Sequence, residues 1–238
     1  MAYISDPYSK LFRFNEALRC AERRIVFDVE GLCRLAAQSV GRSLANVVNL
    51  SKLTEGGFNR TFLITLRDGF QMVARILYPA IVHKYYTVAS EAATMKFLCS
   101  SGLPVPQVYG YSPESENVAK TEYIFMEFMR GMKLSDVWPE LGESDIVSIL
   151  CQHAQLESQM MSISFPAGGS LYYAHDLEKV ARGAAIPLKG ERFCVGPDTN
   201  LPMWYGRRLQ LDVDRRPCVM NLLFLNSNSL VCLDRGLL

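Results

Sequence analysis

The sequence lacks several features that would assign a protein class by themselves. Its formal net charge is only +1 over 238 residues, so electrostatics gives no case for nucleic acid or an anionic membrane as a partner. No apolar run approaches the roughly 20 residues that a transmembrane helix needs. None of the seven cysteines stands in a C-x-x-C pair, which argues against a disulfide framework and a zinc site. We therefore predict an intracellular protein with reduced thiols and no transmembrane segment.

The first 24 residues also lack the composition of a clear mitochondrial presequence. Such a segment is usually rich in Arg and Ser and poor in acidic residues. Here Lys10, Arg13, Arg19, Arg23 and Arg24 are accompanied by Asp6, Glu16 and Glu22. On composition alone, a cytoplasmic location is the expectation.

The strongest pattern that is present runs from Leu53 to Arg75. A period of two is the pattern of a half-buried strand, and two such stretches are separated by Asp68-Gly69, which predicts a type I′ hairpin turn. The alternating apolar residues are Phe62, Ile64 and Leu66, followed by Phe70, Met72, Ala74 and Ile76.

A second turn, between the first two predicted strands, is the candidate ligand-binding element. It contains Gly56, Gly57, Phe58 and Asn59. Paired glycines let the backbone approach a ligand and direct N–H groups at it, which suits a phosphate. The alternative is plain turn chemistry, in which glycine merely supplies a positive φ.

The remaining pattern predicts an α+β fold. His153 lies on the apolar stripe of the last helix and is interpreted as a core histidine, and the residues from Phe165 to Arg216 have a loop-rich composition. Helices are predicted over residues 27–40, 87–99 and 143–163, and further strands over 46–53, 108–111 and 122–129.

Taken in order, these motifs resemble the small lobe of the aminoglycoside phosphotransferase-like kinases, distant relatives of the protein kinases. The resemblance covers roughly residues 26–216. The longer run of motifs is similar to a fungal branch of this family, which implies a mitochondrial location. The motifs are the G-G-x-N-R turn, a basic residue on strand three, Ser90-Glu91 on the next helix, and the runs SEAATMKFL, GLPVPQVYGY, EYIFMEFMRG, FPAGGSLYY and FCVGPDT.

The resemblance implies a protein-kinase-like organisation. A helical segment (1–45) would precede a five-stranded antiparallel small lobe with one helix (46–130). An incomplete, mostly helical large lobe (131–216) and a divergent tail (217–238) would follow. The missing part of the large lobe leads us to expect an exposed lobe surface and self-association through it.

The resemblance also implies a nucleotide site with ATP and Mg²⁺ as cofactors. Arginine can bind phosphate and carboxylate bidentately, so its presence in place of the kinase lysine is compatible with this role. Alternatively, Arg75 and Glu91 form an ordinary ion pair worth about 0–1 kcal/mol. Glu127 is then an ordinary polar residue of a strand. By resemblance, the phosphates would be covered by Gly56, Gly57, Phe58 and Asn59 and bound by Arg75. Glu91 would orient Arg75. The hinge that binds adenine would be formed by Glu127, Phe128 and Met129.

The family's catalytic loop, His-x-Asp with a later Asn and a magnesium-binding Asp, is not found. His83, His153 and His175 are followed two residues later by Tyr85, Gln155 and Leu177. A positioned acid–base group is worth about 10²–10⁴ in rate, and loss of a metal ligand removes further stabilisation. No catalytic residue and no Mg²⁺ ligand are therefore assigned, and we expect no phosphotransfer by this chain.

The tail after Pro217 only sketches the family's metal-binding hairpin. Asn221 and Asp234 flank a turn, but Arg216 stands where the catalytic aspartate is expected. The hypothesis is a departure from the family through a premature stop, a frameshift or altered splicing. A degenerate metal hairpin is the alternative.

The family role is ATP-dependent phosphorylation of a small-molecule hydroxyl group, with an acceptor that the sequence does not identify. The rival class is a non-catalytic nucleotide-binding or interaction protein linked to mitochondria.

Overall fold

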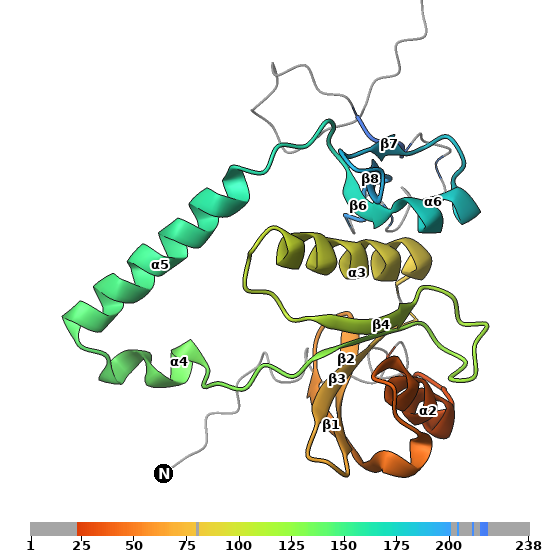
Figure 1. Ribbon diagram of the computed structural model, residues 1–238, viewed down its shortest axis with the longest axis horizontal. Helices are drawn as coiled ribbons and strands as arrows, with labels where there is room; N and C mark the ends of the chain where they lie inside the picture. Colours follow the sequence, from red (N-terminus) through yellow and green to blue (C-terminus); the bar gives the residue numbers. More distant parts are fainter. Residues whose placement is uncertain (1–22, 80, 201–203, 205–210, 212–214, 219–238) are drawn as a thin grey trace, which may run out of the picture. The chain divides into compact units, whose positions relative to one another are not determined.

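The computed structural model describes residues 23–79, 81–200, 204, 211 and 215–218. It divides into two compact units, Met1–Val88 with Tyr109–Glu127, and Ala89–Val108 with Phe128–Leu238. A five-stranded antiparallel sheet organises the first unit, and the second contains a three-stranded sheet (Figure 1). The predicted α+β class and five-stranded sheet are confirmed.

The sheet of the first unit has the strand order β1-β2-β3-β5-β4. Helix α2 precedes it, and helix α3 lies between β3 and β4 in the chain; only the start of α3, up to Val88, belongs to the first unit. The bounds are α2 Val29–Ser39, the 3-10 turn η1 Leu44–Asn46, β1 Val47–Glu55, β2 Asn59–Leu66, β3 Gln71–Leu77, α3 Lys84–Ser100, β4 Val108–Ser112 and β5 Tyr123–Glu127.

Helix α2 begins at a capped end and covers one face of this sheet, as its apolar stripe predicts (Figure 1). Asp28 caps it by accepting a hydrogen bond from the Gly31 N–H at 2.8 Å. Leu32 and Ala36 on its inner side are fully buried. A Cβ on Gly31 would lie 2.1 Å from the Val118 carbonyl oxygen, so only glycine permits this close approach of helix and loop.

Alternation along the strands gives the sheet two distinct faces. The helix face packs against α2 and contains Ile64, Leu66, Met72, Ala74, Ile76 and Phe125. The opposite face, called the Arg75 face below, contains Thr61, Leu63, Val73, Arg75, Ile124 and Met126.

The predicted type of one turn and the predicted bounds of two elements need correction. Asp68 does not have a positive φ, whereas Gly69 does at +82°, so the β2–β3 turn is not type I′. The Gly69 N–H donates to the Leu66 carbonyl and the Leu66 N–H donates to the Phe70 carbonyl, which fits a longer loop whose last residue is left-handed. Helix α3 starts at Lys84 rather than 87, and β5 is confined to Tyr123–Glu127.

The second unit contains a small sheet that the loop-rich composition concealed. Its order is β6-β8-β7, and its strands are only two to four residues long. Gly196 lets β8 pack closely, because a Cβ there would lie 2.3 Å from Leu177 Cδ1. The bounds are α4 Leu134–Val137, η2 Trp138–Glu140, α5 Glu143–Met161, β6 Ser170–Tyr173, α6 Ala174–Val180, β7 Ile186–Pro187 and β8 Phe193–Gly196.

Helix α5 is present as predicted, but none of its residues is buried. The side chain of His153 is 68% exposed, so the interpretation of it as a core histidine is wrong. Of the helices described here, none is long and apolar enough to cross a membrane.

Cys218, the last described residue, pairs with Gly168 of the second unit. Its N–H and carbonyl exchange hydrogen bonds of 3.0 and 2.9 Å with Gly168. The predicted hairpin with Asn221 and Asp234, and the residues considered as a presequence up to 22, lie outside the described residues.

Candidate functional site

The glycine turn joins β1 to β2 in the first unit. The Gly56 N–H donates to the Asn59 carbonyl at 2.9 Å, which closes a tight hairpin. Neither Gly56 nor Gly57 has a positive φ, and a Cβ on Gly57 would find no atom within 4 Å. Neither backbone conformation nor packing therefore requires glycine at position 57.

The outer part of this turn is open. Phe58 is 54% exposed, and no hydrogen bond among the described residues uses the N–H groups of Gly57 or Phe58. The turn is anchored through the Phe58 carbonyl, which accepts a hydrogen bond of 2.9 Å from the Tyr78 N–H. The turn can thus present two N–H donors while its carbonyl side is held.

Arg75 lies on the central strand β3, on the same face as Asn59. In the register, Arg75 is opposite Thr61, and Asn59 is opposite Leu77. Asn59 therefore lies two residues along β2 from Thr61, the partner of Arg75, which is roughly 7 Å measured along the strand direction. Arg75 is half-buried, and burial lowers the pKa of its guanidinium, which still stays protonated at neutral pH.

Glu127 ends β5, on the other face. It lies opposite Met72, so its side chain belongs to the helix face, near Tyr109. Burial, and then the charge of Glu127, raises the pKa of the Tyr109 hydroxyl. Of Glu127, only the backbone is therefore suited to the predicted hinge role on the Arg75 face.

The glycine turn, Arg75 and Glu127 all belong to the sheet of the first unit, but Asn59 and Arg75 share one face and the Glu127 side chain lies on the other. The other predicted site residues, Glu91, Phe128 and Met129, belong to the second unit. Glu91 and Phe128 are half-buried there, and Met129 is 57% exposed. The pairing of Glu91 with Arg75 and the hinge role stay predictions.

Sequence reasoning missed a polar cluster at the base of the glycine turn. Glu55 accepts hydrogen bonds from Lys52 Nζ at 2.5 Å, Arg60 Nε at 2.8 Å and the Tyr78 hydroxyl at 3.3 Å. The bonds from Lys52 and Arg60 lower the pKa of Glu55 to about 2. The opposite charges that flank the turn in the sequence could have indicated the contacts among Lys52, Glu55 and Arg60. The position of Tyr78, in contrast, depends on how the strands pair.

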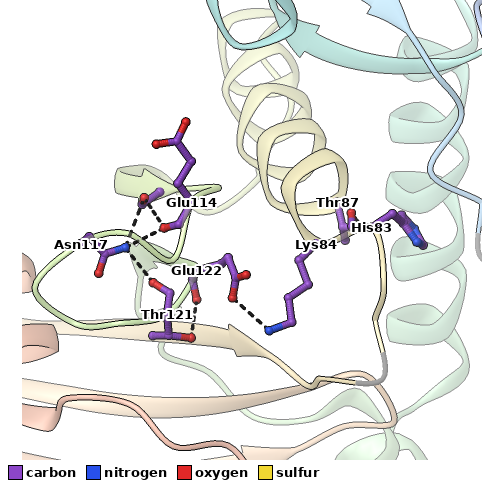
Figure 2. Close-up of polar contacts among 8 residues, drawn as sticks. His83, Lys84, Thr87, Glu114, Asn117, Thr121 and Glu122 are labelled. Atoms are coloured by element: carbon purple, nitrogen blue, oxygen red, sulfur yellow. Dashed lines mark hydrogen bonds and ion pairs between the residues drawn. The ribbon is translucent and has the colours of Figure 1, made fainter. Parts of the chain in front are cut away.

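A separate network joins the start of α3 to the β4–β5 loop of the first unit (Figure 2). Lys84 Nζ lies 3.0 Å from a carboxylate oxygen of Glu122, and both side chains are more than three-quarters buried. Within the same loop, the Asn117 amide donates to the Thr121 carbonyl at 2.9 Å and accepts from the Ala119 N–H at 2.9 Å. These contacts fix the first turn of α3 and the β4–β5 loop.

Comparisons with known proteins give a partial match. No protein-family model matches the chain. A subtelomeric hrmA-associated cluster protein of Aspergillus fumigatus is 40% identical over 171 residues, which are 71% of this chain and 33% of that protein.

Fungal proteins named altered inheritance of mitochondria protein 9, mitochondrial, match as well. The one from Candida albicans is 32% identical over 173 residues, 65% of this chain and 27% of that protein. The one from Lodderomyces elongisporus is 29% identical over 212 residues, 81% of this chain and 32% of that protein. The chain therefore spans about a third of the length of these curated relatives, and it is similar to that part of them.

Proposed function

We propose that the first unit binds a nucleoside triphosphate on the Arg75 face of its sheet. Gly56, Gly57, Phe58 and Asn59 would cover the phosphates, and Arg75 would bind the α- and β-phosphates. The observation that carries the proposal is the open space at Gly57. Because neither φ nor packing requires glycine there, the plain turn explanation is weakened, whereas close approach by a ligand accounts for it.

The donors in this region suit an anionic ligand. Two N–H groups at the tip of the turn and the guanidinium of Arg75 are all donors, and a guanidinium can bind phosphate oxygens bidentately. Asn59 shares the face of Arg75 and lies about 7 Å along the strand from it. Adenine would use the backbone groups of Glu127, where β5 ends.

The proposal extends to a protein-kinase-like ancestry without phosphotransfer by this chain. No His-x-Asp sequence is present. In the part of the chain that the structure describes, no group of three or more His, Cys, Asp or Glu side chains could hold a metal ion. We therefore assign no Mg²⁺ ligand. Tighter ATP binding would not compensate for a missing acid–base group, because uniform binding does not speed the chemical step.

A non-catalytic interaction role linked to mitochondria is the second candidate. The names of the Candida and Lodderomyces relatives contain the word mitochondrial. Helix α5 also exposes apolar side chains, including Val147, Leu150 and Met161. A concentration-dependent increase in mass on size-exclusion chromatography would support self-association through this surface, and a monomer at all concentrations would contradict it.

Calorimetric titration of the purified chain with ATP, with and without Mg²⁺, tests the proposed site. We expect saturable binding that Arg75→Ala weakens about 10- to 100-fold, the loss typical of a charge-assisted hydrogen bond. Arg67→Ala is the matched control, since Arg67 is exposed beyond the far end of β2. No binding by a folded wild-type chain would overturn the proposal.

Gly57→Val tests the role of the turn separately. An added Cβ meets no atom within 4 Å in the free chain, so we expect folding to be unchanged, whereas the added methyl groups should obstruct the phosphates and weaken ATP binding. Adenosine binding should change less. Gly142→Ala, a glycine in the second unit whose added Cβ meets only ordinary contacts, is the control, and equal effects of both variants would contradict the proposed turn contact.

A further inference from the structure

Three residues hold the glycine turn from the side opposite to the proposed ligand. Glu55 is the last residue of β1, Arg60 the second of β2, and Tyr78 follows β3 directly. Glu55 and Arg60 are cross-strand partners, and Arg60 is opposite Ile76, so this row belongs to the helix face. We call Glu55, Arg60 and Tyr78 the turn lock.

Tyr78 contacts the turn at two separate points. Its N–H donates to the Phe58 carbonyl at the tip, and its hydroxyl donates to the Glu55 carboxylate at the base. The Arg60 guanidinium lies over its ring, 5.8 Å from the centroid. Tyr78 itself is 1% exposed, so its side chain is fixed by the core and can serve as a rigid anchor.

The anchor and the proposed phosphate-binding cation lie on one short piece of backbone. Arg75 is held within β3, and Tyr78 stands three residues further along, just past the strand end. Whatever fixes Tyr78 therefore also fixes the separation between the glycine turn and Arg75. Preorganisation of this kind raises affinity by reducing the ordering that binding requires.

From this geometry we infer that Tyr78, acting with Glu55 and Arg60, is a positioning residue for phosphate recognition; the inference rests on the proposed nucleotide site. The lock, together with Lys52, also sets the local charge. Lys52 and Arg60 together outweigh Glu55 by one positive charge. The carboxylate is thus neutralised and lies on the helix face, so the lock orders the turn without placing a net negative charge beside a bound phosphate.

The test compares Tyr78→Phe and Glu55→Gln with wild type. Tyr78→Phe keeps the ring and the N–H but removes the hydroxyl, and Glu55→Gln keeps the shape but removes the charge. We expect faster hydrogen exchange without ligand at the hydrogen-bonded N–H groups of Gly56 and Tyr78, and ATP affinity weakened about 3- to 10-fold. Adenosine, which lacks phosphates, should bind all three proteins equally. Rescue of ATP affinity is not expected from added Mg²⁺.

Matched controls are Tyr123→Phe, another buried tyrosine of the same unit, and Glu30→Gln, from the exposed Glu30–Arg34 pair of α2. Neither should change exchange at the turn or ATP affinity. Unchanged ATP affinity in the lock variants, or equal weakening for ATP and adenosine, overturns the positioning role while leaving the nucleotide site in place. If wild type binds no ATP, the proposed function fails and the positioning role fails with it.

Discussion

Helix α2 of the first unit and helix α5 of the second unit differ in how many of their residues are buried. In the first unit, the 11 residues of α2 include five buried positions, and Leu32 and Ala36 are fully enclosed by the sheet. In the second unit, the 19 residues of α5 include none. Isolated helices shorter than about 12–15 residues are marginally stable in water, and in proteins tertiary packing normally supplies most of a helix's stability. The first unit is therefore expected to be stabilised by its core, and α5 mainly by its own backbone and helix propensity.

The sheets of the two units also differ in strand length and in the contacts that hold them. Strands β1, β2 and β3 are seven to nine residues long, and their alternating side chains build one continuous core with α2. Strands β6, β7 and β8 are short, and close approach at Gly196 and a hydrogen bond of 2.6 Å from the Tyr172 hydroxyl to the Pro197 carbonyl hold them. Periodic burial organises one unit, and a few specific contacts organise the other.

Truncating a leucine in each helix should give the largest difference. Leu32→Ala removes a fully buried side chain and should lower the free energy of unfolding by about 2–5 kcal/mol. Leu156→Ala changes a residue of α5 that is 38% exposed, and should stay within about 0.5 kcal/mol. Urea denaturation followed by circular dichroism measures both. Equal losses would mean that α5 is packed as tightly as α2.

Adding one methyl group at a close approach should give an intermediate effect and test whether the units unfold separately. Gly31→Ala and Gly196→Ala both introduce a Cβ less than 2.5 Å from another residue, which should cost about 1–3 kcal/mol. Both tryptophans, Trp138 and Trp204, belong to the second unit. Tryptophan fluorescence should therefore shift its urea midpoint in Gly196→Ala and keep it in Gly31→Ala.

Two results would decide against this reading. A shift of the tryptophan transition in Gly31→Ala would show that the units unfold as one. A wild-type midpoint in Gly196→Ala, with Gly57→Ala as the control in open space, would show that β8 can move away from Leu177.

The same contrast explains how much of the fold was predictable from the sequence. The alternation at Phe62, Ile64 and Leu66 is a local record of burial, so β2, β3 and their covering helix were found within a few residues. Asp68-Gly69 marked a turn but not its type, because a left-handed glycine fits two loop lengths. The sheet of β6, β7 and β8 was missed, since strands of two to four residues are too short to show a period.

For the candidate site, the sequence identified the residues of the turn and Arg75 but not what holds them. Placing Asn59 and Arg75 on one face and Glu127 on the other needed the register of three strands. Tyr78 had no signal, because its two contacts with the turn span 20 and 23 residues of chain. Local patterns report burial, whereas long-range register determines which polar groups meet.

The smallest effect we expect is the pH dependence of the turn lock. In the folded chain the pKa of Glu55 is lowered to about 2 from an ordinary value of 4.5, through hydrogen bonds from Lys52 and Arg60. A carboxylate with a lowered pKa contributes stability that is complete above its unfolded pKa and is lost as the pH falls through the folded value. Protection of the turn should therefore be constant from pH 7 to about 5 and decline between about 4.5 and 2.

The measurement is the difference in unfolding free energy between wild type and Glu55→Gln as the pH is lowered. Since glutamine cannot ionise, the difference should be constant at neutral pH and should disappear as Glu55 becomes protonated. The side chain is partly exposed and its ion pairs are screened by solvent, so the difference should also shrink in high salt. A difference at pH 2 as large as at neutral pH would mean that the shape of the side chain, and not its charge, holds the two strands together at the turn.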